Sequence, residues 1–270
     1  MNSRIIELCS DLGIDTIGFF EGGISIAFAY NFFDTTDNGF STYTKRADYH
    51  YIVRIYLDKI CSYIQSLGFM AEAFVDSNPL PERYLASKCG VGFIGKNGML
   101  ITKKYGSYVF LSEILTNMPL KLTMPNKNSC GNCNLCIQAC PVNAIYDKTK
   151  CLSLITQKKH INIEEVNSLC GNIFGCDICQ IVCPHNKNAM PSQIDEFKTL
   201  SFMEQDAFIY ASMDNSFFKE YIKKTSCGFK GKNIIIRNAL IALSKRGDEI
   251  RQFKGNSEYI NFYIKLLRGD

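Results

Sequence analysis

Between Tyr49 and Leu67, apolar side chains recur every three or four residues, which is the period of an amphipathic α-helix with one buried face. Asp48 precedes this stretch and is a favourable N-cap, because its carboxylate can accept hydrogen bonds from the free N–H groups of the first turn. We therefore predict a helix over residues 49–67. Its apolar face consists of Tyr49, Ile52, Val53, Tyr56, Leu57, Ile60, Cys61, Ile64 and Leu67.

Short runs rich in β-branched and aromatic residues surround this helix, and such runs favour strands. The combination predicts an α/β domain, which we place at residues 1–122. The stretch MPLKLTMPNKNS at residues 118–129, which spans the end of this domain, contains prolines and asparagines, which are typical of a connection between domains. The predicted strands lie within residues 14–20, 24–30, 70–76, 99–102 and 108–115.

The last part of the chain, residues 193–270, is predicted to be helical. One helix has an apolar face and carries basic residues elsewhere on its surface. The apolar residues are Ile235, Ile236, Ala239, Leu240 and Leu243, and the basic ones are Arg237, Lys245 and Arg246.

Positive charge is concentrated in this C-terminal part. From Lys219 to Lys254 the chain has ten Lys or Arg residues against three acids, whereas the net charge of the whole chain is only +4. Such a segment can neutralise the phosphates of a nucleic acid. A solvated helical surface would have the same composition, so charge alone leaves both interpretations open.

The meaning of the thirteen cysteines depends on where the protein is located. The chain lacks the roughly 20 consecutive apolar residues of a membrane span, and its opening residues lack the pattern of a signal peptide. We therefore predict a cytoplasmic location without membrane association. Thiols stay reduced in the cytoplasm, and the thirteen cysteines are therefore not expected to form a disulfide framework. Their clustering in the middle of the chain predicts metal ligands instead.

The first cysteine run has the spacing C-x2-C-x2-C-x3-C-P. This spacing is typical of proteins with two 4Fe–4S clusters, in which the last cysteine of the run binds the other cluster. A partner run should therefore follow. The first run consists of Cys130, Cys133, Cys136 and Cys140, followed by Pro141.

The second run, Cys176, Cys179 and Cys183 followed by Pro184, has one cysteine fewer. If the runs exchange their last cysteines, Cys183 completes the first cluster and Cys140 joins the second, which then lacks one ligand. Cys151 and Cys170 are the two candidates, and the spacing does not distinguish them. Paired cysteines also build structural zinc sites, but zinc does not account for the two C-x3-C-P endings.

The chain resembles the epoxyqueuosine reductase family, whose enzymes complete the queuosine base of transfer RNA. The resemblance spans about residues 40–190 and extends more faintly over residues 237–243, which look like that family's HEAT-like helices. Besides both cysteine runs, the matching segments are ADYH at 47–50, FVDSNPLPER at 74–83, GVGFIGKN at 90–97, GS at 106–107, EILT at 113–116 and GNIFGCDICQ at 171–180.

The resemblance implies a multi-part α/β and α+β fold. Residues 1–122 would form a corrinoid-binding α/β domain, residues 123–192 a ferredoxin-like domain with two 4Fe–4S clusters, and residues 193–270 HEAT-like helices. It also implies bound cobalamin and assigns the missing cluster ligand to Cys151. The residues expected to contact the corrinoid are Tyr49, His50, Arg83, Lys96, Asn97, Ser107, Gln180 and Ile181.

By the same resemblance, Asp76 matches the family's proton-donating acid. Reducing an epoxide to an alkene removes one oxygen and consumes two electrons and two protons, so an acid beside the departing oxygen is chemically reasonable. We expect burial to raise the pKa of Asp76 for this role. An acidic turn residue before Pro79 is the simpler structural interpretation of the same aspartate.

The predicted activity is reduction of epoxyqueuosine in tRNA. The expected partners are tRNA, bound through the basic C-terminal segment, and a low-potential electron donor; the protein is expected to be a monomer. The chain is short for the family between Phe20 and Tyr43 and has His185 where a tryptophan is usual. Two alternatives therefore stay open: a corrinoid-dependent reductase of another substrate, and an electron-transfer protein that performs no chemistry itself.

Overall fold

The computed structural model describes residues 1–33 and 36–269. Residues 34 and 35, which belong to the shortened stretch between Phe20 and Tyr43, lie outside the described residues. The chain divides into two compact units, each assembled from three segments. Unit 1 comprises Met1–Phe33, Asp48–Ile137 and Gln180–Lys198, and unit 2 comprises Asp34–Ala47, Gln138–Cys179 and Thr199–Asp270.

These units differ from the three consecutive parts predicted from the sequence. Residues 123–192, the predicted cluster domain, are shared between them, because Gln138–Cys179 packs in unit 2 while its two flanks pack in unit 1. Each unit consequently receives part of both cysteine runs.

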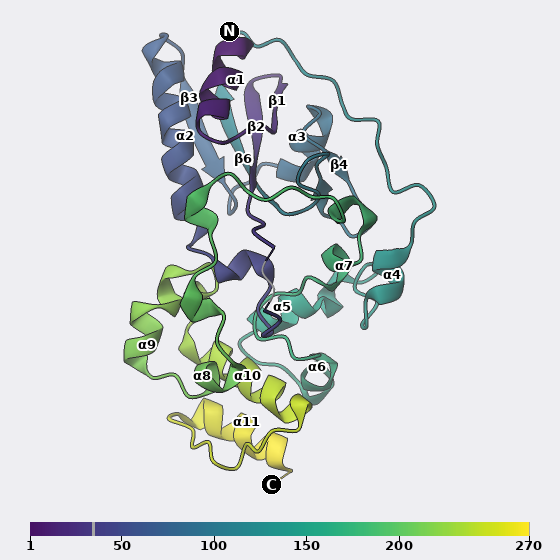
Figure 1. Ribbon diagram of the computed structural model, residues 1–270, viewed down its shortest axis with the longest axis vertical. Coiled ribbons are helices and arrows are strands. Elements are labelled where there is room, and N and C mark those ends of the chain that lie inside the picture. The colour runs from purple at the N-terminus through teal and green to yellow at the C-terminus, as the bar shows by residue number, and fades with distance from the viewer. Residues whose placement is uncertain (34–35, 270) are drawn as a thin grey trace. The chain divides into compact units, whose positions relative to one another are not determined.

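Unit 1 is built on an antiparallel sheet with the strand order β1-β2-β6-β3 (Figure 1). On β2, Ala27 packs with Ala86 of α3 while the adjacent Phe28 packs with Tyr56 of α2. Successive residues of a strand point to opposite faces, so α2 and α3 cover opposite faces of the sheet. The elements are α1 (Asn2–Asp11), β1 (Ile17–Phe20), β2 (Gly23–Ala29), α2 (Tyr49–Ser66), β3 (Ala71–Val75), α3 (Glu82–Lys88) and β6 (Val109–Thr116), with a small hairpin of β4 (Phe93–Ile94) and β5 (Leu100–Ile101).

The helix predicted from the apolar stripe is confirmed as α2. Asp48 is its N-cap, and its carboxylate accepts a hydrogen bond from the backbone N–H of His50. The interior of the predicted face is buried from Ile52 to Ile64, whereas Leu67 at its end is 40% exposed. The five predicted strand regions are also confirmed, since each overlaps one observed strand.

Unit 2 is mainly helical. Its largest core forms where α8 (Ala207–Ala211), α10 (Lys232–Arg246) and α11 (Glu258–Arg268) pack together, with Phe40 and Phe174 joined by a parallel bridge. None of the helices in the described part of the chain has the length and apolar character needed to cross a membrane. The other α-helices of this unit are α5 (Leu152–Gln157), α6 (Ile163–Ser168) and α9 (Asn215–Glu220). The short helices α4 (Leu135–Ala139) and α7 (Ile178–Ile181), which carry cysteines of the two runs, each have residues in both units.

The helix predicted around Ile235 is confirmed as α10, and its apolar face is buried. Arg237, which was placed off the apolar face and counted in the basic segment, has no exposed surface. It therefore cannot contribute to a basic surface. Its guanidinium is instead hydrogen-bonded within unit 2 to backbone carbonyls and polar side chains.

Candidate functional site

Four cysteines line one pocket in unit 1. They are Cys130, Cys133 and Cys136 of the first run and Cys183 of the second. This is the set predicted for the first cluster, including the exchange of the last cysteine between the runs. The other lining residues are Lys96, Asn97, Ile101, Pro184 and His185.

The β4–β5 hairpin forms one wall of this pocket. Phe93 and Ile101 pack against Cys183 and Cys130, and the backbone N–H of Lys96 donates to Cys130 Sγ at 3.4 Å. Lys96 Nζ lies 2.8 Å from the carbonyl oxygen of Cys133. Gly92 is needed here, since a Cβ atom would lie 2.5 Å from the Ile101 carbonyl oxygen. The structure therefore places Lys96 and Asn97 beside the first cysteine set.

The donor atoms of this pocket suit an iron–sulfur cluster. Burial, and then the neighbouring Cys130, Cys133 and Cys183, raise the pKa of the Cys136 thiol. Four close thiols cannot all ionise without a cation, whereas bound metal favours the thiolate form. Within the described residues, no three Cys, His, Asp or Glu side chains are placed to bind one metal ion. In a cubane each thiolate binds a different iron, so a shared point of ligation is not required.

Unit 2 brings together members of the predicted second set. Burial, followed by Asp177, Cys151 and Cys140, raises the pKa of Cys176 to about 11. Cys140 and Cys151 thus lie close enough to Cys176 to act on it electrostatically. The backbone N–H of Ala144 donates to Cys140 Sγ at 3.2 Å. Cys170 is exposed, and its thiol faces the carbonyl oxygen of Ser168 at 3.3 Å.

A second polar centre in unit 1 surrounds Asp76. Its Oδ2 accepts a hydrogen bond from Tyr49 Oη at 2.8 Å and lies 3.2 Å from His50 Nε2. The other ring nitrogen of His50 lies 2.7 Å from Asp48 Oδ1. The tyrosine ring is held by parallel stacking on Phe110 of β6, with ring centroids 4.1 Å apart.

The fold explains why these residues meet. α2 and β3 are joined by a tight connection, pack against each other and run in opposite directions. The start of α2, with Tyr49 and His50, therefore lies beside the end of β3, which Asp76 follows. The sequence analysis missed Asp48 as a second partner of His50. The signal was present, because an N-cap carboxylate two residues before a histidine can reach its ring.

Protonation at this centre differs from the expectation. The hydrogen bond from His50, supported by that from Tyr49, holds the pKa of Asp76 well below its usual value, although burial opposes this shift. Hydrogen bonds to Asp48 and Asp76 raise the pKa of His50 to about 9. The expectation that burial raises the pKa of Asp76 was therefore wrong, and His50 holds the proton at neutral pH.

The backbone after β3 is held in a rarely adopted conformation. Asp76 and Ser77 have φ angles of 46° and 27°, in the left-handed region that L-residues seldom adopt. Asn78 Nδ2 lies 2.5 Å from the Asp76 carbonyl oxygen and 2.9 Å from Glu82 Oε1, which links the turn to the first residue of α3. Such conformations persist only where the surroundings enforce them, and they cluster at functional sites.

We expect the charged His50–Asp76 pair to make stability depend on pH. Because the pKa of His50 rises from 6.5 to about 9 on folding, its contribution is complete below pH 6.5 and is lost as the pH rises through about 9. Because the pKa of Asp76 is lowered, its own contribution is present above its ordinary value and is lost in acid. Thermal unfolding between pH 6 and 10, with an NMR titration of the histidines, checks this.

The control for this titration is His50→Gln, which identifies the His50 signal among the three histidines and should flatten the alkaline fall in stability. A His50 signal that titrates near its ordinary pKa of 6.5 in the folded protein would contradict the ion pair.

The remaining predicted corrinoid contacts lie in three environments. Arg83 donates to the Gly98 carbonyl at 2.9 Å, and Ile181 is 70% exposed. Ser107 and Gln180 are buried and hydrogen-bonded to each other at 2.9 Å. Asn186, which the sequence analysis did not single out, donates to both of them.

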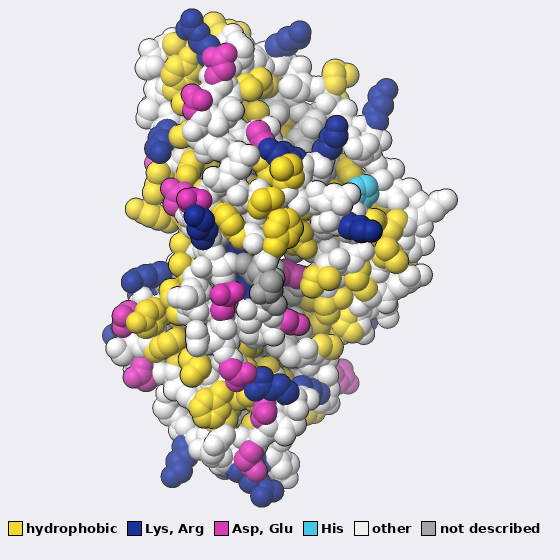
Figure 2. Space-filling model, viewed as in Figure 1, with side chains coloured by type: hydrophobic (Ala, Val, Ile, Leu, Met, Phe, Trp, Pro, Cys, Tyr) yellow, Lys and Arg dark blue, Asp and Glu magenta, His cyan; other side chains and the backbone are white. Residues whose placement is uncertain are grey.

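The basic C-terminal segment carries less free charge than its composition implies. Arg237 is buried, and Arg246 pairs with Asp206 and Asp248. On the face drawn in Figure 2, Lys and Arg side chains are spread among Asp and Glu side chains. Lys219, Lys223, Lys224, Lys230 and Lys254 are exposed.

Comparison with known proteins shows which families share the cysteine runs and the rest of the sequence. Residues 129–186 match the model of the 4Fe–4S double cluster binding domain family. The epoxyqueuosine reductase of Aliivibrio fischeri is 38% identical over 80% of this chain. That of Vibrio cholerae is 33% identical over 88% of this chain and 69% of its own length. This chain spans 61% of the Aliivibrio fischeri protein and 53% of the Bacillus subtilis one.

Solved structures share the whole architecture. A crystal structure of an epoxyqueuosine reductase with an epoxyqueuosine-modified tRNA-Tyr stem loop is 25% identical, with a TM-score of 0.90 over 99% of this chain and 89% of that chain. The Bacillus subtilis enzyme, in a structure with a catalytic aspartate loop swung out of the active site, is also 25% identical and has a TM-score of 0.87 over the same shares.

Proposed function

This chain belongs to the epoxyqueuosine reductase family, and from that membership we propose that it reduces epoxyqueuosine to queuosine in tRNA. One observation carries the proposal. The Tyr49–His50–Asp76 centre and a complete four-cysteine set belong to the same compact unit. A proton source and an electron source in one unit are what removal of an epoxide oxygen requires.

The cysteines would hold two 4Fe–4S clusters. Cys130, Cys133, Cys136 and Cys183 would bind the first. Cys140, Cys151, Cys176 and Cys179 would bind the second, and the proximity of Cys140 and Cys151 to Cys176 supports Cys151 over the exposed Cys170.

Cobalamin is the proposed second cofactor, held by the corrinoid-binding domain of residues 1–122. Asn97 supports it, because its Nδ2 is buried in unit 1 without a hydrogen-bond partner among the described residues. A buried amide donor without a partner is costly, and the amide groups around a corrin ring offer acceptors. When bound, the clusters and cobalamin supply the two electrons of the reaction, one at a time from the clusters.

The residues around Asp76 would transfer protons to the substrate. The proton that His50 Nε2 holds at neutral pH would pass to Asp76 Oδ2 and from there to the departing epoxide oxygen, which leaves Asp76 a carboxylate again. Tyr49 Oη would keep the carboxylate oriented from its stacked position on Phe110. Two protons and two electrons convert the epoxide to an alkene and release its oxygen as water.

The relative solved with a tRNA stem loop supports tRNA as the substrate. We propose that residues 193–270 form HEAT-like helices. The exposed lysines of this C-terminal part would contact the phosphates of the tRNA. Arg237 would not take part, since it is buried. We further propose that the protein is a cytoplasmic monomer and that it receives its electrons from a low-potential donor.

We expect anaerobically purified protein to contain about eight iron atoms, four per cluster. With cobalamin and a chemical reductant, it should remove the epoxide oxygen from tRNA of a strain that lacks its own reductase. Iron analysis and mass spectrometry of the digested nucleosides measure both. Full iron content and cobalamin binding without loss of the oxygen would contradict the proposed substrate, and a zinc-containing protein without iron would contradict the clusters.

A further inference from the structure

Arg237 is a buried cation on α10 of unit 2. It has no exposed surface, although a buried charge is costly unless its donors are satisfied. A guanidinium stays protonated in proteins and carries five N–H donors. The hydrogen-bond partners of this side chain therefore indicate the role of its buried charge.

Every nitrogen of Arg237 is hydrogen-bonded. Nη1 donates to the carbonyl oxygens of Lys158 at 2.7 Å and Lys159 at 3.1 Å, and Nη2 donates to that of Thr156 at 3.3 Å. Nε donates to Asn238 Oδ1 at 3.0 Å. Three of these acceptors are carbonyls at the C-terminal end of α5, the helix that begins immediately after Cys151.

Asn238 connects the end of α5 to the segment that precedes Cys176. Its Nδ2 donates to the Thr156 carbonyl at 2.8 Å and to the Ile173 carbonyl at 2.7 Å. The Thr156 hydroxyl in turn accepts from the N–H of Gly175, the residue before Cys176, at 3.1 Å. Arg237 and Asn238 thus join the segment after Cys151 to the segment before Cys176.

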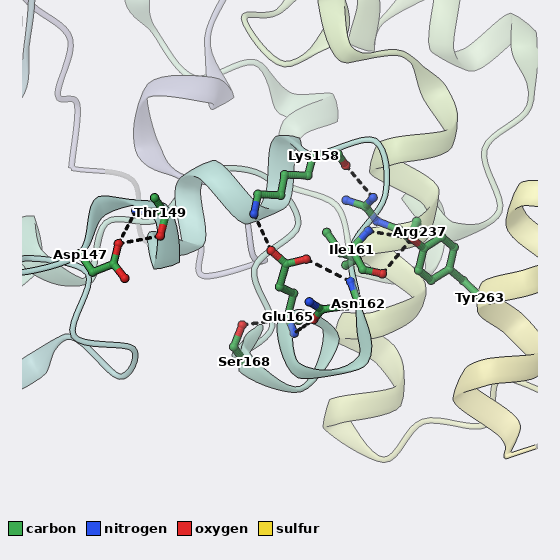
Figure 3. A network of polar contacts seen from close by, with 9 residues as sticks. All are labelled: Asp147, Thr149, Lys158, Ile161, Asn162, Glu165, Ser168, Arg237 and Tyr263. Carbon is green, nitrogen blue, oxygen red and sulfur yellow. Dashed lines mark hydrogen bonds and ion pairs between the residues drawn. The ribbon is translucent and has the colours of Figure 1, made fainter.

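The charge of Arg237 has no direct counterion within the described residues. Its partners are neutral carbonyls, an amide and the Tyr259 hydroxyl, and it lies over the Tyr263 ring at 5.5 Å. The carboxylate of Glu165 forms its ion pair with Lys158 and not with Arg237: Lys158 Nζ lies 2.5 Å from Glu165 Oε1 (Figure 3). Its Oε2 accepts from the N–H of Asn162 at 3.0 Å.

We infer that Arg237 is a positioning residue that also raises the reduction potential of the second cluster. The inference rests on the proposed ligation by Cys140, Cys151, Cys176 and Cys179. Reduction adds a negative charge to a cluster, and net charge is one of the factors that set cluster potentials. A buried positive charge two hydrogen bonds from the peptide before Cys176 stabilises the reduced form, since interior charges are weakly screened.

The test is an EPR-monitored redox titration of the full chain. Arg237→Met should make the reduced-to-oxidised ratio of one cluster about tenfold smaller at a fixed potential, which is about 59 mV for one electron. The other cluster serves as an internal reference and should keep its potential. Arg246→Met, which removes an exposed charge from the same helix, should leave both potentials unchanged.

Unchanged potentials in Arg237→Met with about eight irons bound would overturn the inference. So would equal shifts of both clusters, because the effect would not be local. If Arg237→Met retains only about four irons, Arg237→Gln decides, since it removes the charge but keeps an amide donor: a tenfold smaller reduced-to-oxidised ratio supports the inference and a wild-type potential overturns it. Absence of a second cluster from the wild-type protein would instead refute the proposed ligation.

Discussion

Asp76→Asn should lower the rate of epoxyqueuosine reduction by about 10²- to 10⁴-fold, the usual effect of losing a positioned proton-transfer group. Asparagine has nearly the same shape and can still accept hydrogen bonds from Tyr49 and His50. Its amide cannot pass a proton from His50 to the departing oxygen. Single-turnover assays with pre-reduced protein measure this step, because they exclude the supply of electrons from the rate.

Asp58→Asn is the matched control for this variant. Asp58 is an exposed aspartate on α2 that pairs with Arg54, so its replacement should leave turnover unchanged. Iron content and cobalamin binding should be the same in both variants. A wild-type rate for Asp76→Asn with all cofactors retained would remove Asp76 from the mechanism.

The second large effect concerns the cluster that the spacing left incomplete. Cys151→Ser should lower the iron content from about eight to about four atoms per chain, because the second cluster would lose one of its four thiolates. Electron delivery and turnover should fall with it. Iron analysis and the EPR spectrum of the reduced protein distinguish loss of one cluster from general loss of metal.

Cys170→Ser provides the comparison, since Cys170 was the other candidate and is exposed near the Ser168 carbonyl. It should retain about eight irons. The opposite pattern, with iron lost from Cys170→Ser and kept by Cys151→Ser, would reverse the assignment and the inference about the segment after Cys151.

Local patterns predicted the elements of this fold well. The stripe from Ile52 to Ile64 and the cap at Asp48 specify α2, because both signals lie within a few residues of the helix. The predicted exchange of last cysteines between the runs groups Cys183 with Cys130, and both line the pocket in unit 1.

Properties set by distant parts of the chain were not predictable in this way. The low pKa of Asp76 depends on His50, which meets it only because α2 and β3 lie side by side. Arg237 was counted in the basic segment expected to meet phosphates, yet it is buried, and backbone carbonyls at the end of α5 accept its hydrogen bonds. The interleaving of the two units likewise arises from long-range packing.

That interleaving has a consequence for biosynthesis. Under the proposed ligation, the second set of cysteines is enclosed in the sequence between Cys136 and Cys183 of the first set. The ribosome releases a chain from its N-terminus, so Cys183 emerges after every ligand of the second set. A nascent chain that stops before Cys179 cannot complete either cluster, and the unit that starts the chain is the last to receive its full set of sulfur ligands.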